Sequence, residues 1–158
     1  MLMMSEVLAI RPAEASDASA CAGIVNEWID TTEWMPRVHP HDDVMHHYET
    51  VVFPERDLWI ASLGERLAGF MALSPDAFLT GLYLAAHARS KGIGKALIER
   101  AKRLSPGGLQ LWTFVANKGA QRFYLREGFQ EVRRTDGENE EGLPDILYRW
   151  QPASAGRS

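Results

Sequence analysis

A glycine-opened helix directly after an apolar strand constrains this chain more than any other feature of its sequence. The strand is expected from Phe78 to Leu84, and the helix from about Gly92 to Leu104. Because Gly92 and Gly94 lack side chains, a ligand can approach the backbone N–H groups of the helix N-terminus, where the helix dipole favours phosphate. The pattern predicts an anion-binding turn between a strand and a helix.

Two familiar phosphate-binding motifs do not fit this turn. A P-loop requires a glycine five positions before Gly94 and Ser or Thr after the lysine, but the chain has Arg89 and Ala96 there. The dinucleotide fingerprint requires a small residue three positions after Gly94, where the chain has Leu97. The alternative to an anion site is an ordinary helix start with a solvated basic face.

The basic residues of the chain are concentrated in one segment. The 158 residues carry a formal net charge of −4, yet the segment from His87 to Arg126 has nine basic residues and a single acid, Glu99. That segment is therefore +8 and the remainder −12, which suggests an anionic ligand. Nucleic-acid binding is a rival interpretation, but the basic residues interrupt an apolar stripe and the whole chain is acidic, so we predict no nucleic-acid partner.

Apolar periodicity and turn residues predict one domain from 7 to 151, preceded by a flexible N-terminus (1–6) and followed by a disordered tail (152–158). A hydrophobic content of 46% allows a core without disulfides or a structural metal. The expected order is βααβββαβαββ, typical of an α/β fold on a mixed, mostly antiparallel sheet. The elements are strand 7–11, helices 16–29 and 42–51, strands 58–63, 66–73 and 78–84, helix 92–104, strand 109–115 with both faces buried, helix 117–128, and strands 129–134 and 146–150.

Targeting signals and cysteine usage indicate the compartment. The N-terminus lacks the basic region of a secretory signal, and the longest apolar run, Leu67 to Leu73, is too short to cross a bilayer, so we predict no membrane association. The single cysteine, Cys21, lies among apolar residues and is interpreted as a buried helical thiol in a reducing environment. We expect a cytoplasmic protein.

Two motifs resemble those of the GNAT N-acetyltransferase superfamily. Arg89-Ser90-Lys91-Gly92-Ile93-Gly94 matches its R/Q-x-x-G-x-G/A acetyl-CoA signature, and residues 117–129 resemble its N-x-x-A-x-x-F-Y-x-x-x-G-F motif. The order of predicted elements is similar to that of the family over about residues 7–150. The resemblance implies a GNAT-like central sheet with helices on both faces, and an acetyltransferase that uses acetyl-CoA as co-substrate and no metal.

The resemblance also implies where acetyl-CoA would bind. Backbone N–H groups from Lys91 to Lys95 would hold the pyrophosphate, and Arg89 would fix the loop. The pantetheine arm would pair with the main chain along an edge that the family leaves free where its fourth and fifth strands splay apart. Asn117 would reach the pantetheine amide, cap its helix, or do both. The expected contacts are Leu82, Leu84, Arg89, Ser90, Lys91, Gly92, Ile93, Gly94, Lys95, Asn117, Ala120 and Phe123.

The chemistry implied by the resemblance is direct transfer to an amine. Tyr124 lies one helical turn after Ala120, so its hydroxyl can point toward the cofactor sulfur and protonate the leaving thiolate. The alternative is a tyrosine that closes the core through a hydrogen bond. The main-chain N–H of Leu84 would stabilise the oxyanion. The general base stays open among Glu33, Asp76, His87, Glu140, Glu141, Asp145 and water.

Two acidic loops, 31–40 and 135–144, would form the acceptor walls by the same resemblance. Carboxylates and an aromatic ring suit a cation, so Glu33, Trp34, Glu140 and Asp145 are the expected acceptor contacts. They favour a primary amine of a small molecule. The alternatives are a protein N-terminus or lysine as acceptor, or a CoA-binding module without catalysis. A homodimer also stays open.

Overall fold

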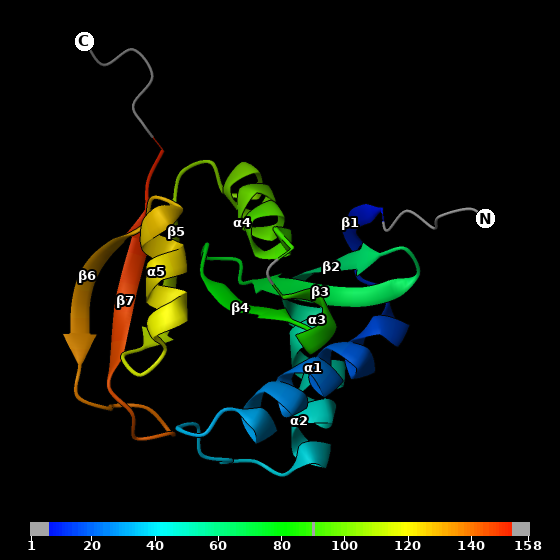
Figure 1. Cartoon of the computed structure of the whole chain (residues 1–158), viewed down its shortest axis with the longest axis horizontal. Coiled ribbons are helices and arrows are strands. Elements are labelled where there is room, and N and C mark those ends of the chain that lie inside the picture. Colours follow the sequence, from blue (N-terminus) through cyan, green and yellow to red (C-terminus); the bar gives the residue numbers. More distant parts are fainter. Residues whose placement is uncertain (1–6, 90, 153–158) are drawn as a thin grey trace.

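The computed structural model describes residues 7–89 and 91–152, so the predicted N-terminal segment 1–6, Ser90, and residues 153–158 of the predicted tail lie outside the described part. Figure 1 shows the arrangement of its elements. In chain order they are β1 (Leu8–Pro12), η1 (Ala15–Asp17), α1 (Ala18–Thr31), α2 (His41–His47), η2 (Tyr48–Val52), α3 (Phe53–Glu55), β2 (Asp57–Leu63), β3 (Arg66–Leu73), β4 (Leu79–Leu84), η3 (Ala86–Ala88), α4 (Ile93–Leu104), β5 (Leu109–Phe114), α5 (Lys118–Arg126), β6 (Gln130–Thr135) and β7 (Asp145–Trp150).

The strands of the described residues form two antiparallel sheets, ordered β1-β2-β3-β4 and β5-β7-β6. The sheets meet at a parallel bridge between Phe78 and Gln110, where Gln110 N donates to Ala77 O at 3.1 Å. Beyond the bridge β4 and β5 diverge (Figure 1). The predicted mixed, mostly antiparallel α/β architecture is confirmed, and the divergence leaves one edge of β4 open.

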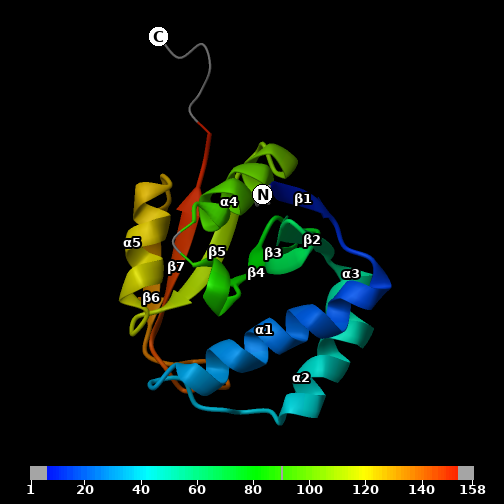
Figure 2. The same ribbon diagram turned by 45° about the vertical axis from the view of Figure 1, so that its right-hand side comes forward.

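Helices cover both faces of the first sheet, with α1 on one side and α4 on the other (Figure 2). Successive side chains of a strand point to opposite faces. Ile60 and Phe70 therefore belong to the core beneath α1, whereas Ala61 and Met71 belong to the core beneath α4. Both cores are fully buried at these positions. The predicted placement of helices on both faces is confirmed.

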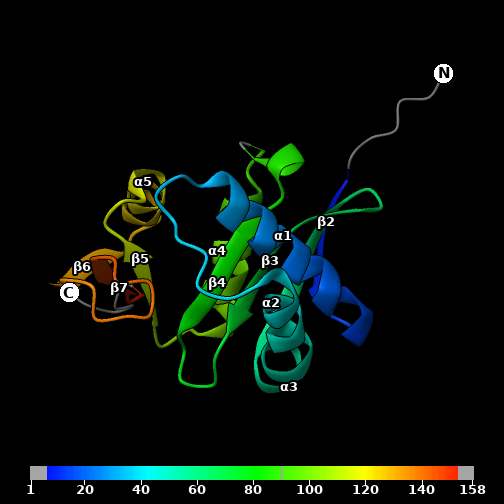
Figure 3. The same ribbon diagram turned by 90° about the horizontal axis from the view of Figure 1, so that it is seen from below.

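The helix α5 lies beside the second sheet, apart from α1 and α2 (Figure 3). Its predicted N-cap is confirmed, because Asn117 Oδ1 accepts a hydrogen bond from Ala120 N at 3.1 Å. The helix ends at a left-handed residue, since Gly128 has φ +94°. The chain then folds back, and Phe129 N donates to Tyr124 O at 2.9 Å. These local contacts fix which side chains α5 presents to the core.

Two elements differ from the sequence-based expectation. The helix expected at 42–51 is part of a longer helical segment, in which the π-helical turn η2 separates α2 from α3. Pro54 is the second residue of α3, directly after the π-helical turn. The expectation that residues 109–115 are buried on both faces is wrong, because Trp112 is 39% exposed. β5 is the edge strand of its sheet, and only the face carrying Leu111 and Thr113 is covered.

The environment of Cys21 agrees with the interpretation of a buried helical thiol. The side chain lies in α1 with no exposed surface, and burial raises the pKa of its thiol to about 12. Cys21 is therefore protonated at neutral pH and cannot act as a nucleophile there. No helix within residues 7–89 and 91–152 is long and apolar enough to cross a membrane.

Candidate active site

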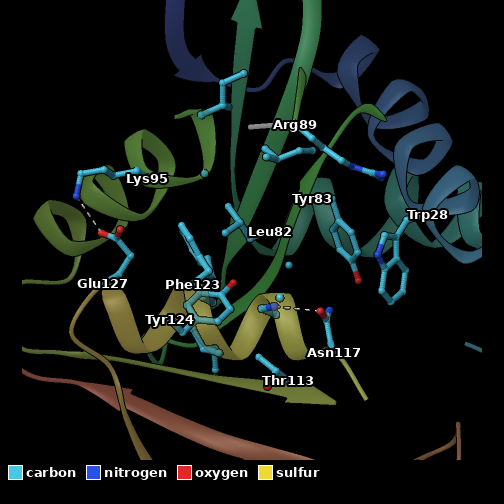
Figure 4. A pocket seen from close by; sticks show the side chains of 18 of the residues that line it. Trp28, Leu82, Tyr83, Arg89, Lys95, Thr113, Asn117, Phe123, Tyr124 and Glu127 are labelled. Carbon is cyan, nitrogen blue, oxygen red and sulfur yellow. Dashed lines mark hydrogen bonds and ion pairs between the residues drawn. The ribbon is translucent and has the colours of Figure 1, made fainter. Parts of the chain in front are cut away.

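A cleft of about 760 Å³ opens where β4 and β5 diverge (Figure 4). Its walls come from these two strands, the first turn of α4, α5 and the C-terminal end of α1. The cleft brings together most of the residues expected to bind acetyl-CoA or act in catalysis. Those that line it are Leu82, Leu84, Arg89, Gly92, Ile93, Gly94, Lys95, Asn117, Ala120, Phe123 and Tyr124.

The open edge of β4 presents main-chain groups to this cleft. In an antiparallel pair, alternate residues of a strand bond to the same neighbour. Ala85 N donates to Ala68 O of β3 at 2.8 Å, so the main-chain N–H and C=O groups of Tyr83 also point toward β3. The N–H and C=O of Leu82 and Leu84 point the other way, into the cleft. Both residues therefore have the main-chain orientation that the predicted pairing with pantetheine requires.

The glycine turn begins α4 with unpaired main-chain donors. Gly92 has φ +77°, a conformation that glycine adopts without strain. The first bond within the helix joins Ala96 N to Gly92 O at 3.1 Å, so the N–H groups of Ile93, Gly94 and Lys95 have no acceptor within the helix. A Cβ at Gly94 would lie 3.4 Å from Phe123 Cζ, so glycine here keeps room between α4 and α5.

The side chain of Lys95 makes protein contacts at the edge of the cleft. Its Nζ lies 3.3 Å from Glu99 Oε2 and 3.3 Å from Glu127 Oε1. Hydrogen bonds to these two carboxylates raise the pKa of Lys95. The Glu127 side chain is only 4% exposed, so its charge depends on this partner. The structure thus ties the first turn of α4 to the end of α5 (Figure 4).

The hydroxyl of Tyr124 faces the cleft from α5, on the same wall as Phe123 (Figure 4). The ring is held by edge contacts to Phe123 at 5.0 Å and Phe129 at 5.4 Å. Within the described residues the hydroxyl makes no hydrogen bond, so the alternative of a tyrosine that closes the core through one is not what the structure contains. Burial and the nearby Tyr83 raise the pKa of Tyr124 above its ordinary value, which keeps the phenol protonated at neutral pH.

Three further side chains line the cleft that the sequence did not single out. Trp28 from α1, Tyr83 from β4 and Thr113 from β5 face it (Figure 4). Thr113 Oγ1 is buried and has no hydrogen-bond partner among the described residues. Strand alternation could have identified Tyr83, because it lies between Leu82 and Leu84 and so points to the α1 face. No local sequence pattern indicates that Trp28 lines the cleft.

The acceptor residues expected from the sequence lie outside the lining of the cleft. Trp34 packs behind it, 5.7 Å from Trp28 and 5.8 Å from Phe114. Glu33 is exposed in the loop before it. The carboxylate of Asp145 accepts hydrogen bonds from Thr135 and Asn139 within its own hairpin.

The two acceptor loops nevertheless meet. His39 Nε2 lies 2.8 Å from Glu140 Oε1, and both side chains are about half exposed. This contact joins the loop after α1 to the loop between β6 and β7, which Figure 1 shows approaching each other. The two loops therefore meet, and Glu140 is paired with His39.

The candidate bases differ in their distance from the cleft. Asp76 lies in the turn between β3 and β4, bonded to Ser74, and does not line the cleft. His87 lies in η3, where its Nε2 is buried without a partner among the described residues, also outside the lining. Glu141 also lies outside the lining of the cleft; burial, and to a smaller extent this carboxylate, raises the pKa of Tyr83 to about 12.

The comparison with protein families shows to which family a chain with this cleft belongs. The model of the acetyltransferase (GNAT) family matches residues 23–129, which include the glycine turn and α5. The chain belongs to the GNAT family. It is an acyl-CoA-dependent acetyltransferase.

This GNAT enzyme is similar to two peptidyl-lysine N-acetyltransferases, to one of them over most of its length. It is 28% identical over 149 residues to the peptidyl-lysine N-acetyltransferase YiaC of Escherichia coli, spanning 89% of this chain and 95% of that protein. The peptidyl-lysine N-acetyltransferase YjaB of Salmonella typhimurium is 35% identical over 86 residues, 52% of this chain and 57% of YjaB.

Solved structures share the fold of the GNAT enzyme. Apo-form YjaB from Escherichia coli has a TM-score of 0.75 at 23% identity, covering 93% of this chain and 99% of that one. The structure of yncA from Salmonella typhimurium, with its cofactor acetyl-CoA, has a TM-score of 0.72 at 17% identity, covering 96% and 98%.

The cleft of the GNAT enzyme is chemically suited to acetyl-CoA. Unpaired N–H groups at the start of α4 suit a pyrophosphate, and the open β4 edge suits the amides of pantetheine. The unpartnered Thr113 Oγ1 in the cleft wall offers a further polar contact. No group of three or more metal-ligating side chains occurs among residues 7–89 and 91–152.

Proposed function

We propose that this enzyme acetylates the ε-amine of lysine in proteins or peptides. The observation that carries the proposal is the similarity to the peptidyl-lysine N-acetyltransferase YiaC over 95% of that protein's length. An acidic rim supports it, since Glu33, Glu140 and Glu141 lie in the two acceptor loops and attract a cation. The small-molecule amine favoured by the sequence is the second candidate, supported by the His39–Glu140 contact that joins the two loops.

The proposed reaction is a direct transfer between two bound substrates. The lone pair of the amine forms a bond to the acetyl carbon of acetyl-CoA, and the carbon–sulfur bond breaks as the thiolate leaves. The Leu84 N–H, which points into the cleft, is proposed to donate to the carbonyl oxygen as negative charge develops. Tyr124 is proposed to give its phenolic proton to the thiolate, completing CoA.

The amine must lose a proton in this reaction, and we assign its removal to Glu141 acting through water. Among the acids considered from the sequence, Asp76, Glu140 and Asp145 are engaged elsewhere, with Ser74, His39 and Thr135 respectively. Glu141 directly follows Glu140, whose contact with His39 joins the two acceptor loops, and this supports its position near the acceptor. The Tyr124 phenol is restored by a proton from solvent after CoA leaves.

Replacing Tyr124 by Phe tests the proposal, because it removes the proton donor and keeps the ring. We expect kcat for a lysine peptide with a blocked N-terminus to fall by about a hundredfold to ten-thousandfold, as for loss of a general acid. The affinity for acetyl-CoA should stay unchanged. Thiol release measures the first quantity and calorimetry the second. Glu141→Gln should lower kcat without changing the affinity for acetyl-CoA.

The outcomes separate the candidate functions. Turnover of small amines without turnover of any lysine peptide would replace lysine by the second candidate. Acetyl-CoA binding without turnover of any amine by the unaltered enzyme would indicate a CoA-binding module. Unchanged kcat in Tyr124→Phe would exclude Tyr124 as general acid.

A further inference from the structure

Four aromatic side chains form a continuous series at the α1 side of the cleft, which we name the aromatic arch: Tyr83, Trp28, Trp34 and Phe114. The rings of Tyr83 and Trp28 lie 5.6 Å apart, those of Trp28 and Trp34 5.7 Å, and those of Trp34 and Phe114 5.8 Å. Each pair meets edge to face, at angles of 65° to 79°. Such contacts are favourable beyond the area that they bury, so the rings hold one another in place.

The aromatic arch spans the gap between the two sheets. Tyr83 comes from β4 and Phe114 is the last residue of β5, and these strands belong to different sheets. Trp28 comes from α1, and Trp34 from the loop that follows it. Trp28, Tyr83 and Phe114 line the cleft, whereas Trp34 lies behind and links Trp28 to Phe114.

The position of the aromatic arch separates it from the anion-binding turn. Figure 4 shows Trp28 and Tyr83 beside Asn117, away from Lys95 at the start of α4 and from Glu127 at the end of α5. Thr31 and Thr32, at the end of α1, line the cleft next to it. The acidic loops lie beyond Thr31 and Thr32. The carboxylate of Glu141 contributes to the raised pKa of Tyr83. A cation attracted to the rim would therefore pass the rings on its way to Tyr124.

The chemistry of the three lining rings selects what can pass. Aromatic rings without a charged partner favour contact with methylene groups. Burial of each methylene group contributes about 0.8 kcal/mol to binding, which is roughly fourfold in affinity. The ring faces also attract an ammonium group as it enters. A peptide α-amine has no methylene stem, because its backbone begins at the adjacent carbon. The lining therefore suits an amine at the end of an unbranched chain and disfavours an α-amine.

We propose that the aromatic arch is the acceptor subsite of this enzyme, and that it selects a primary amine at the end of an unbranched methylene chain. The inference rests on the proposed acetyl transfer and names the acceptor chemistry within it. Trp28, Tyr83 and Phe114 contact the chain, and Trp34 acts as a positioning residue that sets the spacing of Trp28 and Phe114.

A length series tests the aromatic arch. The probes are one peptide with lysine, ornithine or diaminobutyrate at the same position and a blocked N-terminus, together with the three corresponding N-acetylated amino acid amides. For the unaltered enzyme we expect kcat/KM to fall about fourfold for each methylene removed. Trp28→Leu should raise KM for the lysine probe about tenfold and flatten this dependence below about twofold per methylene. Its KM for acetyl-CoA should not change.

Two further variants guard against trivial loss of folding. Trp28→Phe keeps a ring at this position and should retain the length dependence. Trp150→Leu removes a half-buried tryptophan that packs against the core outside this cleft, and should leave the dependence unaltered. If Trp28→Leu keeps the fourfold steps, or if the unaltered enzyme shows none, the aromatic arch is not the acceptor subsite.

The two probe formats separate this inference from the function on which it rests. A length dependence with the amides but no turnover of the peptides supports the aromatic arch and overturns lysine acetylation in proteins. Turnover of the peptides without length dependence supports lysine acetylation and overturns the aromatic arch. Efficient acetylation of a free peptide N-terminus with no lysine would overturn both.

Discussion

Asn117 has a side-chain acceptor and a side-chain donor, and the fold uses only the acceptor. Its Oδ1 binds Ala120 N at 3.1 Å, which begins α5. The residue also lines the cleft (Figure 4), and in the proposed binding mode its amide nitrogen would meet the cofactor. The two roles expected from the sequence are thus assigned to different atoms, so they can be separated by substitution.

Asn117→Asp keeps the capping oxygen and removes the amide donor, whereas Asn117→Ala removes both. We expect Asn117→Ala to lower the free energy of unfolding by about 1 kcal/mol, and Asn117→Asp to change it little. Both variants should weaken acetyl-CoA binding if the amide nitrogen contacts pantetheine. Urea unfolding and calorimetry measure the two effects. Full affinity in Asn117→Asp would leave Asn117 as a helix cap alone.

Residues governed by local rules could be predicted from the sequence, and residues governed by tertiary contacts could not. Asn117 and Gly128 obey helix-capping preferences that depend on a few neighbouring positions. Trp28 and Tyr83 are far apart in the chain, and their contact at 5.6 Å depends on how α1 crosses β4. Trp34 was assigned to the acceptor for its residue type, but Trp28 and Phe114 occupy the cleft wall in front of it.

At the scale of elements, α4 and α5 are joined by a buried carboxylate. Glu127 ends α5 and pairs with Lys95 in the first turn of α4 at 3.3 Å. Its main-chain oxygen also accepts a hydrogen bond from Lys102 Nζ at 2.5 Å. The glycine turn and Tyr124 belong to these two helices, so this contact fixes the phosphate end of the cleft relative to the catalytic end.

Glu127→Gln should destabilise the protein more than the loss of an ordinary surface ion pair. The Glu127 side chain is almost fully buried, so glutamine would place an amide N–H₂ without an acceptor in a site with little solvent, and we expect a loss of about 1–3 kcal/mol. Glu99→Gln is the matched control, because it breaks an exposed pair with the same Lys95 and should cost about 0.3–0.5 kcal/mol. Chemical denaturation measures both. Equal losses would show that burial of Glu127 adds nothing.

Element types were predictable where apolar periodicity was strong, as in α4 and β3. The exposure of Trp112 was not, because the sequence of β5 does not reveal that the strand lies at a sheet edge with one face uncovered. At the site, the contacts of Lys95 could not be predicted from the sequence either. Its place in the glycine turn predicted a role toward pyrophosphate, but its distance from Glu127 depends on how α4 packs beside α5.

At the scale of the whole molecule, the fold is divided into two sheets, and residues of both sheets line the cleft. The sheets share the Phe78–Gln110 bridge and the aromatic arch, and acetyl-CoA would add contacts to β4, α4 and α5 together. Only some residues of the basic segment from His87 to Arg126 lie at the cleft. Arg89 lines the cleft, but Arg100 stacks on Trp59 at 5.0 Å and serves packing.

Acetyl-CoA should therefore stabilise both sheets. At about one hundred times its dissociation constant we expect a gain of about 2.7 kcal/mol in the free energy of unfolding. Hydrogen exchange should slow at Leu82 and Leu84 and also along β5. Adenosine 3′,5′-bisphosphate, which lacks pantetheine, is the control and should leave these strands unprotected. Protection confined to the start of α4 would contradict a pantetheine site along β4.

The divergence of β4 and β5 also affects how the protein meets other polypeptides. Beyond the Phe78–Gln110 bridge, each of these strands carries main-chain groups without a strand partner on one side. An unpaired edge of this kind is a template for strand addition by another chain. In the expected binding mode, pantetheine occupies that edge as a substitute strand. Bound acetyl-CoA would then also protect the enzyme from aggregation. When acetyl-CoA is scarce, more of the enzyme would be in the unliganded form, which aggregates more readily.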